Sequence, residues 1–183
     1  MTTSPSRRRA LAAVGTSVFF AVAPGVVAGV VPWLLTGWHP AEPLPHWAPV
    51  RAAGAVVLVV ATVVLVQAFV RFVVEGLGTP SPAAPTERLV VGGLYRYVRN
   101  PMYLAVAAAI VGQALLLGRP ALLLYAAAVT ALNAAFVHTY EEPALRRRFG
   151  ADYDAYRTAV PAWWPRRHPW VGRSGGAAAS SSS

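Results

Sequence analysis

Two short segments of this 183-residue chain carry most of the side chains that could do chemistry. The first, "GLYRYVRNPMYLAV", places Arg96, Arg99 and Asn100 directly before an apolar stretch. The second, "YEEPALRRRFG", places Glu141 and Glu142 directly after another apolar stretch. Cationic, amide and carboxylate groups at the ends of apolar helices fit a site for a zwitterionic or charged ligand that lies beside a lipid pocket.

Each of these groups also has a purely structural interpretation, and the residues alone leave both open. Arg96 and Arg99 can anchor the cytoplasmic end of a membrane helix. Glu141 and Glu142 can favour the start of a helix that is opened by Pro143. Only a fold that brings the two segments together favours the ligand site.

The elements that must position these segments are membrane helices. The chain is 56% hydrophobic and only 13% charged, which is too apolar for an ordinary soluble domain of this size. At about 1.5 Å of rise per residue, about twenty apolar residues cross a hydrocarbon core of about 30 Å as a helix. We expect such helices in four stretches: Ala10 to Leu35, Ala52 to Val70, Met102 to Gly118 and Ala121 to Tyr140. The predicted fold is all-α, a polytopic membrane protein with about four transmembrane helices.

The last two apolar stretches form a predicted hairpin, because Gly118 and Pro120 break the helix between them. Tyr103 begins one arm and Glu141 ends the other, and the two antiparallel helices have similar lengths. The hairpin therefore returns Tyr103 and Glu141 to the same membrane face. The segment "GLGTPSPAAPTERLVVGG" is rich in proline and glycine and can cover this face as an ordered loop or a re-entrant segment.

The arginines set the predicted orientation. All sixteen basic residues are arginines, and they flank the apolar stretches instead of forming one basic face, which argues against nucleic-acid binding. With a cytoplasmic N-terminus, only Arg51 and Arg119 lie outside. Both termini are then cytoplasmic, and the arginine-only, alanine-rich composition favours a bacterial inner membrane. A cleaved signal peptide, with Arg7 to Arg9 as its basic region, is the competing interpretation of the N-terminus.

A metal site is not expected. The chain has no cysteine, so thiolate ligands and disulfides are excluded. His39 and His46 lie in the segment "GWHPAEPLPHWAP", but no third ligand is near them in the sequence. The prolines and tryptophans of this segment are typical of a loop at the membrane surface.

The chain divides into four predicted regions. These are a basic tail at residues 1–9, two transmembrane helices within 10–78, a core with the last two helices at 79–167 and a disordered tail at 168–183. In the core, Phe149, Tyr153, Tyr156 and Val160 recur at helical spacing and predict a short cytoplasmic amphipathic helix. This helix can lie on the leaflet with its arginines exposed, or it can contact a ligand directly.

The two polar segments together resemble a known family. The run "LVVGGLYRYVRNPMYLAV", followed after the hairpin by "EEPALRRRFGADYDAYRTAVPAWWPR", is similar to the isoprenylcysteine carboxyl methyltransferase and phospholipid methyltransferase group of integral membrane enzymes. The similarity covers Thr79 to Arg166. It implies that residues 79–167 are a methyltransferase-like catalytic core with S-adenosylmethionine as methyl donor, bound at the cytoplasmic ends of the last helices. It also implies a lipophilic methyl acceptor that enters from the membrane lipid.

The resemblance further implies which residues hold the cofactor. The family's Arg-His-Pro-x-Tyr element corresponds to Arg99, Asn100, Pro101, Met102 and Tyr103, so an asparagine stands where the family has histidine. Glu141 matches the first glutamate of the family's pair. Positions that line the family's cofactor pocket correspond to Arg88, Leu89, Val90 and Tyr95. These residue types suit S-adenosylmethionine, whose ammonium, sulfonium, carboxylate and flat adenine need carboxylate, amide and aromatic partners.

The sequence departs from the isoprenylcysteine enzymes at one place that bears on the methyl acceptor. In those enzymes an arginine shortly before the glutamate pair holds the substrate carboxylate, whereas "NAAFVHTYEE" contains no arginine. His138 is the candidate catalytic residue in this run, since an imidazole can take a proton from an amine, thiol or hydroxyl near neutral pH. A histidine at a helix end without a catalytic role is the other interpretation.

Two other classes of protein fit parts of the sequence. A non-catalytic membrane protein, such as an assembly factor or a degenerate relative, would lose Tyr103 or Glu141 more readily than the hydrophobicity of its helices. The presence of both residues favours the enzyme. A transporter or channel subunit would place charged residues near the middle of the membrane, whereas here they cluster at one face.

Overall fold

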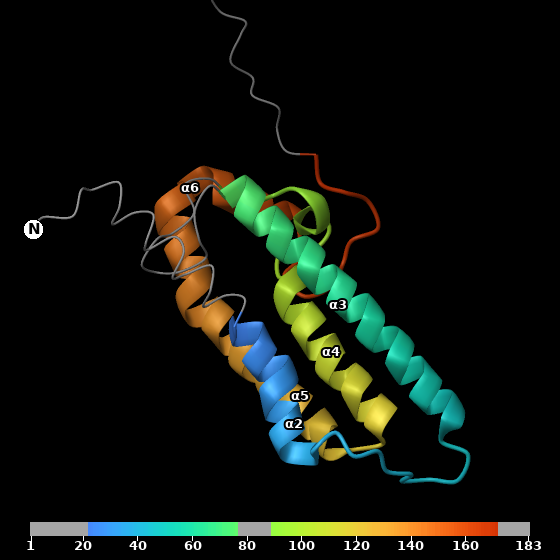
Figure 1. The fold of residues 1–183 in the computed structure, drawn as a ribbon. Helices are drawn as coiled ribbons and strands as arrows, with labels where there is room; N and C mark the ends of the chain where they lie inside the picture. Colours follow the sequence, from blue (N-terminus) through green and yellow to red (C-terminus); the bar gives the residue numbers. More distant parts are fainter. Residues whose placement is uncertain (1–21, 77–88, 172–183) are drawn as a thin grey trace, which may run out of the picture.

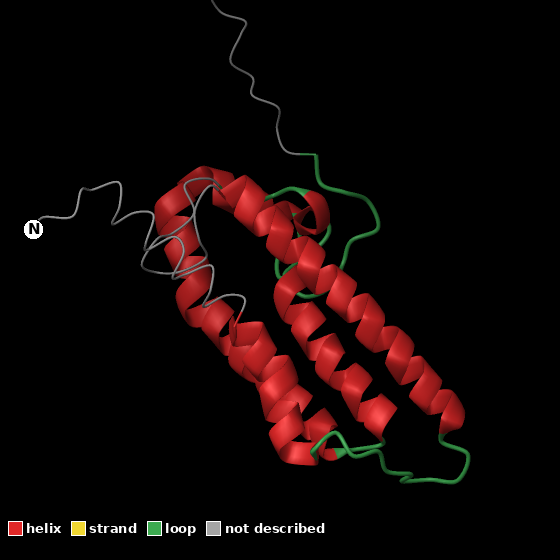
Figure 2. Ribbon diagram, viewed as in Figure 1, coloured by secondary structure: helices red, strands yellow, loops and turns green. Residues whose placement is uncertain are grey.

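The computed structural model describes residues 22–76 and 89–171, and all regular secondary structure in these ranges is helical (Figure 2). The expectation of an all-α fold is confirmed. The elements, labelled in Figure 1, are η1 (Val26–Val30), α2 (Val31–Thr36), α3 (Ala48–Gly76), η2 (Gly93–Arg96), α4 (Pro101–Leu117), α5 (Ala121–Phe136), η3 (Val137–Glu141) and α6 (Glu142–Ala159). Of these, η1 and η3 are π-helical and η2 is a 3-10 helix.

Four apolar helical segments correspond to the four predicted stretches. Ala48–Phe72 and Ala121–Ala159 are long and apolar enough to cross a membrane, and Val22–Thr36 and Pro101–Leu117 are shorter apolar helices. The first half of the predicted N-terminal helix, residues 10–21, lies outside the described residues. The chain is a helical membrane protein.

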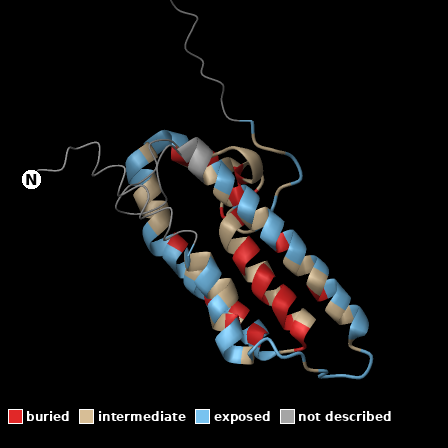
Figure 3. Ribbon diagram, in the orientation of Figure 1, coloured by how far each residue is buried: buried red, intermediate tan, exposed pale blue. Residues whose placement is uncertain are grey.

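Helix α4 lies at the centre of the bundle (Figures 1 and 3). It packs along α3 and also contacts α5 and η1. Ile110 of α4 and Leu122 of α5 are fully buried in the apolar cluster between these helices. The outer face of α3 instead exposes valines, among them Val56, Val59 and Val63. Exposed aliphatic side chains on a long helix are expected where that helix faces lipid.

Two glycines allow α3 and α4 to approach closely. Gly54 of α3 and Gly112 of α4 are both buried, and a Cβ atom on Gly112 would lie 2.8 Å from the backbone nitrogen of Leu58 and 3.0 Å from the carbonyl oxygen of Gly54. Small residues at such contacts are typical of helix packing in membranes.

We expect Gly112→Ala to destabilise the protein by about 1 to 3 kcal/mol, because the added methyl group forces the two backbones apart. Thermal unfolding in detergent micelles would measure this loss. Gly29→Ala is the matched control, since a Cβ atom there has no neighbour within 4 Å. Equal melting temperatures for the two variants would contradict the close contact.

A proline lies two residues after the end of each π-helical segment. Pro32 follows η1 and Pro143 follows η3, each in the first turn of the next helix. A proline has no N–H to donate and its ring clashes with the carbonyl four residues earlier, so the preceding turn widens. Through this wide turn α5 continues into α6. The helix that begins at Ala121 therefore continues past Tyr140, where the apolar stretch of the sequence ends, and reaches Ala159.

The long helix bends at Gly150, whose φ of 52° and ψ of −125° suit glycine and strain other residues. The bend carries the second half of α6 across the end of the bundle (Figure 1). There Tyr153, Tyr156 and Val160 are buried against the segment before α4, which includes Leu89. The apolar face predicted for this helix is confirmed, but it covers protein and not the leaflet.

The chain after α6 folds back onto the same end of the bundle. The Trp170 backbone N–H donates to the carbonyl oxygen of Arg96 at 2.9 Å, and the Trp170 ring lies 5.3 Å from that of Tyr156. The predicted start of a disordered tail at residue 168 is therefore too early. The remainder of that tail, residues 172–183, lies outside the described residues, as does the predicted basic tail at 1–9.

Candidate active site

A cavity of about 920 Å³ lies between the membrane helices and the segment before α4. Ligand pockets in proteins usually measure about 300 to 1,000 Å³. Toward the middle of the bundle its wall is mostly apolar, with Val27, Val106 and Val129 among the lining residues. Toward the end that carries α6 the wall is polar and aromatic, and it includes Glu141 and Tyr103. The cavity can therefore hold a polar ligand and an apolar one end to end.

Glu141 and Tyr103 meet in this polar wall. The Tyr103 hydroxyl donates to Oε2 of Glu141 at 3.1 Å, which confirms that the hairpin brings the two positions to one face. Among the described residues no arginine forms an ion pair with Glu141. A carboxyl group in this position can accept a hydrogen bond from a positively charged ligand in the cavity.

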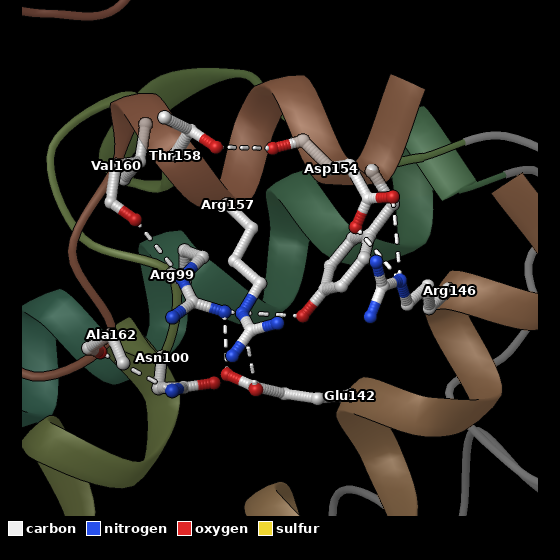
Figure 4. A network of polar contacts seen from close by, with 10 residues as sticks. Arg99, Asn100, Glu142, Arg146, Asp154, Arg157, Thr158, Val160 and Ala162 are labelled. Carbon is white, nitrogen blue, oxygen red and sulfur yellow. Dashed lines mark hydrogen bonds and ion pairs between the residues drawn. The ribbon is translucent and has the colours of Figure 1, made fainter. Parts of the chain in front are cut away.

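Glu142 is placed very differently, although it is the next residue. Its Oε1 accepts from Nη1 of Arg99 at 2.6 Å and its Oε2 lies 3.4 Å from Nε of Arg157 (Figure 4). Arg99 also donates to the Tyr153 hydroxyl at 3.1 Å and to the Val160 carbonyl oxygen at 2.9 Å. The side chains of Arg99 and Glu142 are only 11% and 12% exposed. This network ties the start of α4 to both halves of α6.

Further hydrogen bonds fix the segment that forms the polar wall. Nδ2 of Asn100 donates to the Ala162 carbonyl oxygen at 3.2 Å, and the Tyr156 hydroxyl donates to the Tyr95 carbonyl oxygen at 2.7 Å. These bonds tie the segment before α4 to α6 and to the chain after it.

Most of the predicted cofactor residues lie together in the cavity wall. The structure places there Leu89, Val90, Tyr95, Arg99, Asn100, Pro101, Met102, Tyr103 and Glu141. Arg88 lies outside the described residues. The side chains of Arg99 and Asn100 are largely occupied by contacts within the protein, so their main role in the structure is to hold the wall in place.

Sequence reasoning missed several residues of the cavity. Ala23, Pro24 and Val27 of the first helix line it, although that helix carries no recognisable motif. Asn133 and Phe136 of α5 also line it. Asn133 lies four residues before Val137 and eight before Glu141. Residues at these spacings share one face of a helix, and this was the available signal.

His138 does not belong to the cavity wall. It is exposed, whereas its neighbours Val137 and Glu141 line the cavity. The structure therefore gives no support to the prediction that His138 is the catalytic base.

For the methyl transfer that the resemblance implies, we expect His138→Gln to retain activity to within about twofold at every pH, as is usual for a substitution on the surface. The assay would follow transfer from labelled S-adenosylmethionine across the pH range. Activity lost at low pH and restored at high pH would instead indicate a base at this position.

A family model described as phospholipid methyltransferase matches residues 50–152, which is more than half of the chain. The chain therefore belongs to the phospholipid methyltransferase family, and its class is that of membrane methyltransferases. The match extends from the start of α3 into the second half of α6 and so includes both polar segments. No curated protein matches the chain.

Proposed function

We propose that this protein transfers a methyl group from S-adenosylmethionine to a lipophilic or small amphiphilic acceptor. The observation that carries the proposal is the carboxylate of Glu141, which is oriented by Tyr103, lacks an arginine partner among the described residues and lines a cavity with an apolar far end. Bound S-adenosylmethionine would supply a methyl group on a positively charged sulfur.

The residues of the polar wall fit this cofactor. Glu141 can accept a hydrogen bond from the cofactor ammonium or balance its positive charge. Phe72, Tyr95 and Val90 supply an aromatic and apolar surface suited to a flat adenine ring. The cofactor would lie at the α6 end of the bundle, which the arginine distribution predicts to be the cytoplasmic end.

Catalysis would rest mainly on positioning. A sulfonium is already activated for methyl transfer, so the protein needs to hold the acceptor in line and to exclude water. Well-oriented intramolecular reactions reach effective molarities of about 10⁵ to 10⁸ M. The hydrogen-bonded wall described above supplies such a rigid frame. The bond from the methyl carbon to sulfur would break as the bond to the acceptor forms, S-adenosylhomocysteine would leave as the neutral thioether, and the proton of the acceptor would pass to water.

Methyl transfer to lipid would test the proposal. Membranes that contain the protein, incubated with S-adenosylmethionine tritiated in its methyl group and a total lipid extract, should produce label that partitions into organic solvent. Membranes without the protein are the control. The absence of extractable label above this control, together with no binding of S-adenosylhomocysteine, would favour a non-catalytic membrane protein of the same fold.

The orientation gives a separate prediction. Reporter fusions after Pro45 and after Arg119 should read as external, and a fusion after Arg173 should read as cytoplasmic, because most arginines then lie inside. Paired cytoplasmic and periplasmic reporters at each position would measure this. An external reading after Arg173 would contradict the placement of the cofactor at the cytoplasmic face.

A further inference from the structure

Asn133 differs from the other polar side chains in the membrane helices α4 and α5. Gln113 donates to the Ala28 carbonyl oxygen at 2.6 Å, the Tyr125 hydroxyl donates to the Val27 carbonyl oxygen at 2.9 Å, and the Thr130 hydroxyl donates within its own helix at 2.7 Å. The side-chain amide of Asn133 forms no hydrogen bond within the part of the chain that the structure describes. An unpaired polar group among membrane helices is costly, which makes a functional role the first hypothesis.

Asn133 faces the cavity from its apolar part. The four residues of α5 that line the cavity are Val129, Leu132, Asn133 and Phe136, and Asn133 alone among them has a polar side chain. It lies eight residues before Glu141 on the same helix, which corresponds to roughly 12 Å along the axis. It is therefore deeper in the membrane than the carboxylate assigned to the cofactor.

We propose that Asn133 binds the polar group of the methyl acceptor and so positions it and selects it. This inference rests on the proposed methyl transfer. A carboxamide is uncharged and can both donate and accept a hydrogen bond. The described apolar wall beside it carries no charged side chain, since it is formed by residues such as Val27, Val106 and Val129. The matching acceptor is a lipophilic molecule whose reacting end is an uncharged hydrogen-bonding group, such as a hydroxyl or neutral amine, and not a carboxylate.

Asn133→Leu tests this role without removing a contact within the protein. With a total lipid extract as acceptor and methyl-tritiated S-adenosylmethionine, the variant should lose about tenfold or more of the label transferred, mainly through a higher KM for the extract. Its affinity for S-adenosylhomocysteine should stay within about twofold of the parent. Asn133→Gln, which restores the amide on a longer side chain, should recover part of the transfer. Thr130→Val is the matched control, because its hydroxyl is bonded within α5.

The chemistry of the labelled product tests the acceptor class. Label on a hydroxyl or an amine is stable to mild base, whereas a methyl ester releases volatile methanol. Base-stable label and a loss specific to Asn133→Leu would support the inference. If Asn133→Leu transferred as much label as the parent, or if base released the label, the role of Asn133 would be overturned, while the methyltransferase proposal would remain intact. If the parent protein neither binds S-adenosylhomocysteine nor transfers label, the proposed function itself fails, and the inference fails with it.

Discussion

Glu141→Ala should weaken the binding of S-adenosylhomocysteine by about 1.5 to 3 kcal/mol, which is roughly ten- to hundredfold in affinity. The reason is that Glu141 is the carboxylate in the polar wall without an arginine partner among the described residues, so a cationic ligand would lose its charge-assisted hydrogen bond. Isothermal titration calorimetry in detergent would measure the change.

Two variants separate the charge of Glu141 from its orientation. Glu141→Gln keeps the shape and can still accept from Tyr103, but it removes the charge, so it should lose nearly as much affinity as Glu141→Ala. Tyr103→Phe keeps the charge and removes the 3.1 Å hydrogen bond, so its effect should be smaller. Equal affinity for the parent and both Glu141 variants would show that Glu141 does not contribute to cofactor binding.

Glu142→Ala should lower the free energy of unfolding by about 3 to 5 kcal/mol. Its carboxylate is bracketed by Arg99 and Arg157, and the substitution leaves the guanidinium of Arg99 buried without its closest charge partner. Thermal unfolding in detergent would report the loss. Arg99→Ala should be comparably destabilising, because Arg99 also holds Tyr153 and the Val160 carbonyl.

The control for this prediction is an ion pair on the same helix. Arg146 and Asp154 are 62% and 42% exposed and lie 3.0 Å apart, so solvent screens their attraction. Arg146→Ala should cost less than about 1 kcal/mol. If Glu142→Ala melted at the same temperature as Arg146→Ala, the buried network would not be what fixes α6 to the start of α4.

The positions of the helices could be predicted from the sequence because apolar length and helix-breaking residues are local signals. The turn at Gly118, with a left-handed φ of 62°, separates α4 from α5 as expected. That hairpin alone is enough to predict that Tyr103 and Glu141 lie close together. Contacts that depend on a single turn between two regular helices can be predicted from the sequence.

The different contacts of Glu141 and Glu142 could not be predicted in the same way. It depends on the wide turn of η3 and on the bend at Gly150, which together bring Arg157 back to Glu142 while Glu141 faces the cavity. The proline at position 143 was a signal for such a turn, but the direction of the chain after it depends on tertiary packing.

The contribution of the first helix and of Asn133 was missed for a different reason. The first helix carries no motif, and a single asparagine in an apolar stretch does not reveal what its side chain faces. The arrangement of the helices around one cavity places both in the cavity wall. Conversely, His138 had the right chemistry and the right distance in sequence, yet it lies on the exposed side of its helix. Position along the chain did not fix the direction of the side chain within the widened turn.

The most direct test of the central claim, that this cavity holds S-adenosylmethionine at its polar end, is photochemical cross-linking. Purified protein irradiated with methyl-tritiated S-adenosylmethionine would be digested, and the labelled peptides would be identified by mass spectrometry. We predict label in the segments 89–103 or 140–156, with labelling prevented by excess S-adenosylhomocysteine and reduced in Glu141→Gln. Label confined to other segments, or label that excess S-adenosylhomocysteine does not prevent, would contradict the assignment of the cofactor to this cavity.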